Sequence, residues 1–303
     1  MRYFLIAIIS LSTLIFLLSF LKDFFGQRRN LSKAPWPPLM GMGFVANFFD
    51  TLGIGSFATT TSFYKFTKLV HDRVIPGTLN VGHCLPTVVE ALIFLTVVKV
   101  APVTLFSMMV SATLGAVLGA GIVSKMPVRN IRLGLGGALI LVALAMLAGI
   151  LNLFPSGGNA FGLTGIKLVV AVTVSFVLGS LMTIGIGLYA PCMALVYALG
   201  MHPIAAFPIM AGSCALLMPW AGMRFIKTGA YDRKAALGLT SLGIVGVFIA
   251  AFLVKSLPLT ILKWVVVVVI LYTSSMMFRS VFKKEEAVPV ESKAEAALER
   301  FNV

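Results

Sequence analysis

The chain alternates long apolar runs with short connections that carry most of its basic residues. Seven runs are long enough to cross about 30 Å of hydrocarbon at ~1.5 Å per helical residue. They are Tyr3–Leu21, Thr78–Val98, Val103–Val123, Ile131–Leu153, Ile204–Phe225, Ala235–Val254 and Leu259–Phe282. Each run predicts a transmembrane helix. The first is too long for the apolar part of a signal peptide and no small-residue cleavage site follows it, which favours an uncleaved helix.

Two further apolar runs, Leu39–Val70 and Leu168–Gly200, are too long for one span and carry a Gly-Ile-Gly sequence near the middle. Unwound backbone survives at membrane depth only where it is buried in protein or lines a wet cavity. Each run therefore predicts a pair of half-helices that fold back on each other around a polar site. A broken run that still crosses the membrane is the alternative.

The two broken runs belong to a longer internal repeat. Gly53 aligns with Gly185 and Gly55 with Gly187 at an offset of 132 residues, and Gly115 aligns with Gly246. The sequence predicts an all-α polytopic membrane protein with one extra N-terminal helix and two homologous halves, each with a broken hairpin and three transmembrane helices. The predicted segments are 1–34 (N-terminal helix and basic linker), 35–155 (first half), 156–282 (second half) and 283–303 (polar cytoplasmic tail), all in one transmembrane domain.

Composition and charge support a membrane protein and indicate its orientation. Hydrophobic residues make up 59% of the 303 residues and charged residues 11%, with a formal net charge of +14. If both broken runs enter and leave on the same side, seventeen Lys and Arg gather on one face and five on the other. If every run crosses, the split is ten against twelve. The positive-inside rule therefore favours inverted halves.

Several function classes lack the residues that they need. No basic stripe with interleaved aromatics supports nucleic-acid binding. The cysteines Cys84, Cys192 and Cys214 lie in apolar runs without metal-ligand spacing, so we expect packing residues, no disulfide framework and no bound metal. No Ser-His-Asp or Cys-His pairing, metalloprotease or nucleotide-binding motif is present. We therefore expect neither an enzyme nor a cofactor.

Two acidic residues, Asp50 and Glu90, lie inside apolar runs, where an unpartnered carboxylate is costly. Glu90 shares one helical face with Asn80, His83 and Thr87. This face predicts a proton relay or substrate lining, or else a hydrogen-bonded seam between helices. Asp50 and Glu90 are candidate proton-coupling groups. For Asp50 the alternative is a cap for the half-helix that begins at Ser56.

The half-helices that start after each break would aim free amides and positive dipole ends at the point where the breaks meet. This geometry predicts an anion as ligand. Hydroxyls and backbone would hold it, because no Lys or Arg lies next to either break to neutralise its charge. Alternatively, each Ser or Thr bonds its own helix. The predicted substrate-binding residues are Asn47, Thr51, Gly53, Gly55, Ser56, Thr59, Thr60, His83, Gly185, Gly187, Tyr189 and Ser213.

On these residues the chain resembles the TauE/SafE family of sulfite exporters and sulfonate permeases. The motifs are Leu52-Gly-Ile-Gly55, Thr183-Ile-Gly-Ile-Gly187, Ala190-Pro191 and the basic turn 224–232. The resemblance implies a secondary transporter that exports sulfite, an organosulfonate or a related organic acid across the cytoplasmic membrane, with proton coupling as a hypothesis. The alternative is an uncoupled anion channel or a uniporter driven by the membrane potential. Small-residue faces at 115–119 and 134–137 also leave a homo-oligomer open.

Overall fold

The computed structural model describes residues 2–71, 74–119, 128–151, 158–182, 188–256 and 258–282. Among these residues the secondary structure is helical, and a single bridge between Ala160 and Met201 is the one sheet-like contact. Six of the described helices are long and apolar enough to cross a membrane. The predicted class, an all-α protein with many membrane spans, is confirmed.

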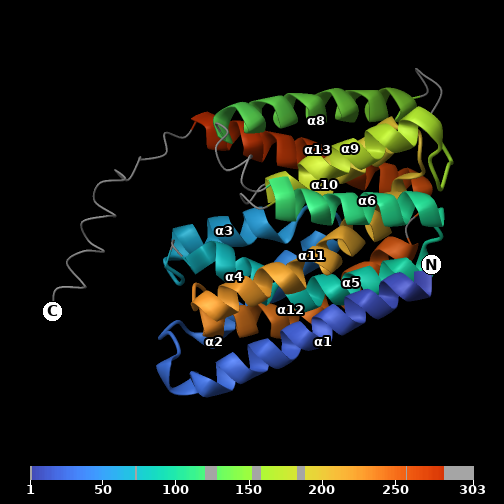
Figure 1. Ribbon diagram of the computed structural model, residues 1–303. Helices are drawn as coiled ribbons and strands as arrows, with labels where there is room; N and C mark the ends of the chain where they lie inside the picture. The colour runs from blue at the N-terminus through green and yellow to red at the C-terminus, as the bar shows by residue number, and fades with distance from the viewer. Residues whose placement is uncertain are drawn as a thin grey trace.

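The helices follow the predicted apolar runs and pack as a layered bundle (Figure 1). In chain order they are α1 (Arg2–Gly26), α2 (Trp36–Thr51), α3 (Ser56–Thr67), α4 (Ile75–Gly82), α5 (Cys84–Val97), α6 (Pro102–Leu114), α8 (Val128–Ile150), α9 (Gly165–Met182), α10 (Tyr189–Ala198), α11 (Ala206–Thr228), α12 (Arg233–Ser256) and α13 (Leu259–Phe282). Three short segments join them: the 3-10 turns Arg28–Asn30 and Pro203–Ala205 and the π-helical turn Gly115–Gly119.

The predicted run Thr78–Val98 is divided at His83 into α4 and α5. Pro86 explains the division, because it has no N–H to donate to the carbonyl of Gly82 four residues earlier. The hydroxyl of Thr240 on α12 donates to that carbonyl instead, at 2.8 Å. The irregularity is therefore satisfied by a neighbouring helix, and it places His83 at a turn in the interior.

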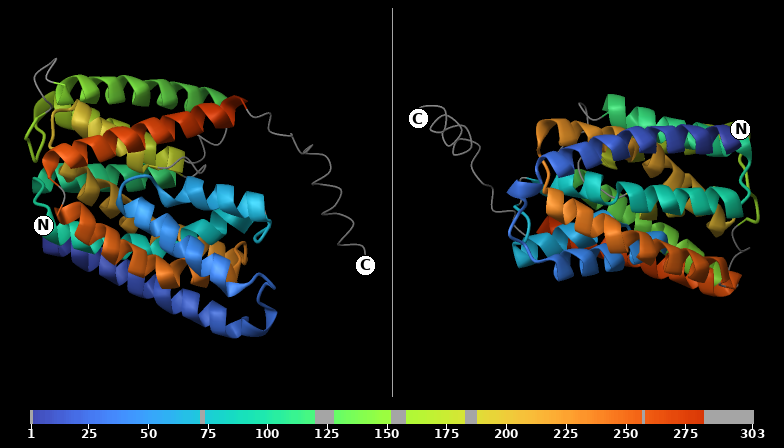
Figure 2. Two further views of the ribbon diagram at one scale, coloured as in Figure 1. Left: turned by 180° about the vertical axis from the view of Figure 1, so that it is seen from behind. Right: turned by 90° about the horizontal axis from the view of Figure 1, so that it is seen from below.

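The first broken run forms a hairpin. Figures 1 and 2 show α3 turning back beside α2, with the break in the interior and both open ends near the end of α1. The second broken run also has its two ends together: Lys167 Nζ donates to Leu199 O at 3.1 Å, and His202 N donates to Ala160 O at 2.8 Å. These contacts lie at the opposite end of the bundle, so the two broken runs open in opposite directions.

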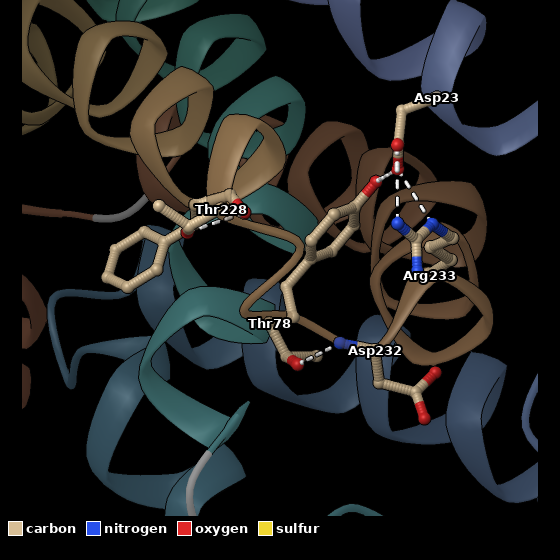
Figure 3. Close-up of polar contacts among 7 residues, drawn as sticks. Asp23, Thr78, Thr228, Asp232 and Arg233 are labelled. Carbon is tan, nitrogen blue, oxygen red and sulfur yellow. Dashed lines mark hydrogen bonds and ion pairs between the residues drawn. The ribbon is translucent and has the colours of Figure 1, made fainter. Parts of the chain in front are cut away.

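One end of the bundle is tied by the loop between α11 and α12 (Figure 3). Arg233 donates from Nε to Asp23 Oδ2 of α1 at 2.7 Å and from Nη2 to Oδ1 at 3.2 Å. Tyr231 also donates to Asp23, and Asp232 N donates to Thr78 Oγ1 at 2.9 Å. Burial and the bond to Asp23 raise the pKa of Tyr231, so the phenol remains a donor at neutral pH. The loop thus joins α1, α4 and α12.

The closest helix packing occurs where glycines meet backbone. On α12, a Cβ added to Gly246 would lie 2.5 Å from Phe44 O of α2. Next to α6, a Cβ added to Gly115 would lie 1.9 Å from Phe176 O of α9. Side chains reinforce the second pair, since Ser111 Oγ donates to Val172 O at 2.7 Å. In each pair a helix of one predicted half packs on a helix of the other.

Candidate functional site

The first break has the hydrogen bonds of a glycine-terminated helix. Gly53 N donates to Asp50 O at 2.7 Å and Ile54 N to Phe49 O at 3.0 Å, which is the Schellman pattern. Gly53 and Gly55 have φ of +98° and +89°, a region that side chains other than glycine rarely adopt. The Gly-Ile-Gly sequence therefore ends α2 and starts α3 as predicted.

Asp50 lies in the last turn of α2 and reaches across the break. Its Oδ1 accepts a hydrogen bond from Ser56 N, the first amide of α3, at 2.7 Å. The Asp50 side chain is almost fully buried. The capping interaction weighed from the sequence is thus present, and an amide that was expected to face a bound anion is occupied by a carboxylate of the chain itself.

His83 joins the two helices on either side of the break. Its Nδ1 pairs with Asn47 Oδ1 of α2 at 2.9 Å, and its Nε2 pairs with Thr60 Oγ1 of α3 at 3.1 Å. Asn47 in turn donates to Gly43 O at 2.7 Å. All three side chains of this Asn47–His83–Thr60 chain have no exposed surface. The predicted stripe is therefore a hydrogen-bonded seam at His83.

Glu90 lies deeper along the same helix, beside Thr51 of α2 and Tyr189 of α10. Both carboxylate oxygens of Glu90 and the hydroxyl of Tyr189 are buried, yet none makes a hydrogen bond of normal geometry with a described residue. Asp50 is close enough to both groups to interact with them electrostatically. Buried polar atoms without protein partners are rare, and positions that bind a ligand, an ion or a proton are among the places where they occur.

The first break contacts the other half of the chain directly. A Cβ atom added to Gly53 would lie 2.5 Å from Met193 Sδ of α10 and 3.8 Å from Met210 Cε of α11. Tyr189 at the start of α10 lies close enough to Glu90 and Asp50 to interact with both. The first broken hairpin and the helix that follows the second break therefore meet in the interior.

Some predicted residues are placed differently. Thr59 Oγ1 donates to Ser56 O at 2.8 Å and Ser213 Oγ to Ile209 O at 2.7 Å, so both hydroxyls bond their own helices. Asn80 bonds Pro76 O at the surface and does not join the buried stripe. Gly185 and Gly187 lie outside the described residues.

The sequence interpretation missed sulfur-bearing side chains around the meeting point. Met193 and Met210 lie next to Gly53. Cys214 Sγ lies 3.6 Å from Sδ of Met182, which is the last residue of α9. These residues sit in continuous apolar segments, so no local signal separated them from ordinary packing residues. Within the described part of the chain, no three His, Cys, Asp or Glu side chains gather as a metal site would require.

Comparison with known proteins supports the resemblance. Residues 167–300 match the family model described as sulfite exporter TauE/SafE. The resemblance predicted from the sequence is confirmed over these residues, and the description of the family is that of an exporter. The matched range covers most of the predicted second half and the tail. Searches of curated proteins and of solved structures gave no match.

Proposed function

We propose that the protein is a secondary transporter that exports a small anion, such as sulfite, an organosulfonate or a related organic acid, across the cytoplasmic membrane. The match of residues 167–300 to the sulfite exporter TauE/SafE family model supports this proposal. The observation that carries this proposal is the buried break at Gly53, which contacts Met193 of α10, together with the buried Tyr189 hydroxyl near Asp50 and Glu90, which makes no hydrogen bond of normal geometry with a described residue. A broken helix at the interface of two repeats is where secondary transporters bind their substrates.

We further propose that the two halves are inverted repeats. The contact between Gly115 and Phe176 has a counterpart between Gly246 and Phe44, and the two pairs are related by offsets of 131 and 132 residues. Gly179 and Ala112 likewise correspond to Asn47 and Gly243. A two-fold relation between halves predicts such exchanged pairs. The opposite openings of the two hairpins also support it.

In this arrangement the cargo lies between the first break and α10. Ser56 and Tyr189 are the groups that we propose face it, since the Ser56 amide starts α3 and the Tyr189 hydroxyl has no partner among described residues. No Lys or Arg is among the buried polar residues of the described chain. The anion would be held by amide dipoles and hydroxyls, which suits a singly charged group better than a phosphate.

The first test is a thermal-shift panel on the purified protein with sulfite, methanesulfonate, sulfoacetate and dicarboxylates. A ligand that binds only the folded state raises the melting temperature. Anions that do so are then followed in proteoliposomes by counterflow. Saturable exchange supports a transporter, whereas a conductance that rises without saturation would identify a channel. No shift with any of these anions would reject the proposal.

A matched pair of variants tests the site. Tyr189→Phe removes a hydroxyl that makes no hydrogen bond of normal geometry with a described residue, so we expect little change in stability and a smaller anion-induced shift. Ser107→Ala removes an exposed hydroxyl that bonds Val103 O on α6, and we expect its anion response to equal that of the wild type. Equal responses in both variants would remove Tyr189 from the site.

A further inference from the structure

The Asp50 carboxylate occupies the position at the start of α3 where a bound anion would be stabilised most strongly. An anion at a helix N-terminus is stabilised by free amides and by the positive dipole end. Asp50 Oδ1 already accepts a hydrogen bond from Ser56 N at 2.7 Å. The carboxylate is buried and belongs to the last turn of α2. A second anion cannot use this amide while the carboxylate holds it.

A second observation indicates that the place is built for a ligand. The Tyr189 hydroxyl and both Glu90 oxygens are buried close to one another and to Asp50, and none of them makes a hydrogen bond of normal geometry with a described residue. Two adjacent buried carboxylates without a cation cannot both ionise cheaply. The site therefore holds a proton in some step, and the number of negative charges that it tolerates is small.

We propose that Asp50 competes with the cargo for the same backbone amide. The ionised carboxylate accepts the hydrogen bond from Ser56 N, and protonated Asp50 releases this N–H to the anion. Each anion that binds then brings one proton with it. The proton comes from the water on the side from which the anion enters, so the net charge of the site is the same before and after loading. This inference rests on the proposed function and specifies its coupling.

The titratable groups that face Asp50 come from several packed helices. They are Glu90 on α5, Tyr189 on α10 and Cys214 on α11. His83, between α4 and α5, bonds Asn47 one turn before Asp50. Of these, Glu90 is the other carboxylate, so the experiment must separate the two acids.

The test measures anion binding to the purified full-length protein by calorimetry, in two buffers of different ionisation enthalpy, between pH 5.5 and 8. Methanesulfonate is the first probe, because its own charge is constant over this range; sulfite, corrected for its own proton, is the second. For the wild type we expect one proton taken up per anion and a Kd that rises about tenfold per pH unit where Asp50 is ionised.

Asp50→Asn keeps an oxygen that can accept from Ser56 N but removes the charge. We expect no proton uptake and a Kd that is constant with pH and close to the wild-type value at low pH. Glu90→Gln is the matched control. It should retain the proton uptake, because in this proposal the proton that accompanies the anion binds Asp50 and not Glu90.

A second variant tests the same hydrogen bond in case Asp50→Asn does not fold. Ser56→Pro removes the contested amide at the first position of α3, where proline is tolerated. We expect weaker anion binding at every pH and loss of the pH slope. Proton uptake that persists in Asp50→Asn, or that disappears in Glu90→Gln alone, would overturn the role of Asp50. Failure of the wild type to bind either anion would instead count against the proposed function.

Discussion

The His83 side chain connects the two half-helices of the first broken run. It is bonded on one side to Asn47 of α2 and on the other to Thr60 of α3. Without it the two half-helices would lose the hydrogen-bonded link that the imidazole makes between them, in addition to the bond from Ser56 N to Asp50. A residue that the sequence suggested as substrate-binding therefore has a clear structural task, the positioning of the hairpin.

We expect His83→Ala to lower the free energy of unfolding by about 1–3 kcal/mol, because it leaves two buried polar partners unsatisfied. Asn80→Ala on the same helical stripe is the control, since its amide bonds only Pro76 O at the surface; its effect should be below about 0.5 kcal/mol. Unfolding in detergent, followed by tryptophan fluorescence, gives both values. Equal losses would mean that the seam contributes nothing specific.

The two glycines of the first break can be distinguished in the same way. Both have positive φ, so alanine at either position is strained by about 1–3 kcal/mol. Only Gly53 also faces a neighbour, since its added Cβ would lie 2.5 Å from Met193 Sδ, whereas Gly55 has nothing within 4 Å. We expect Gly53→Ala to be the more destabilising variant in detergent unfolding.

A double-mutant cycle checks the cause of that difference. Met193→Ala should destabilise the wild type more than it destabilises the Gly53→Ala protein, where it relieves the contact. Additive effects of the two changes would show that the backbone strain at Gly53, and not the packing against α10, decides its identity.

The helices themselves show which signals were local and which were not. The break at Gly53 was predictable because Gly-Ile-Gly places two residues that tolerate positive φ in the middle of a run too long for one span. The division between α4 and α5 at His83 follows from the missing amide of Pro86. The partners of His83 were not predictable, because helical periodicity assigns a residue to a face but not to a neighbour. Asn47 and Thr60 lie 36 and 23 positions away in the chain.

Helix pairs joined through glycine are the rigid parts of the bundle. A Cβ added to Gly179 of α9 would lie 1.9 Å from Ala112 O of α6. We expect Gly179→Ala to force α6 and α9 apart and to cost about 3 kcal/mol or more in unfolding free energy. Gly41→Ala in α2 is the control, because nothing lies within 4 Å of its added Cβ. It should be neutral or stabilise the helix by up to about 1 kcal/mol.

The bundle as a whole does not divide along the predicted halves. The helix α2 of the first half packs on α12 of the second, and α9 of the second half packs on α6 of the first. Rocking of one half against the other would have to break backbone contacts in both pairs. If the proposed transporter works by alternating access, movement between these two glycine-packed pairs would preserve the contacts within each pair.

A covalent link across α6 and α9 tests this division. Ser111 Oγ donates to Val172 O, so the two positions lie on adjoining turns of α6 and α9, and cysteines introduced there can be joined by a short bis-methanethiosulfonate reagent, which forms a disulfide with each thiol and is released by reduction. If the α6–α9 pair moves as a unit, the linked protein should exchange anions in counterflow at the rate of the unlinked double variant, and reduction should change nothing. Proteins that carry only one of the two introduced cysteines, treated with the same reagent, are the controls. Exchange that stops on linking and returns on reduction would show that the sequence halves separate after all, and the exchanged packing would then describe only one state of the cycle.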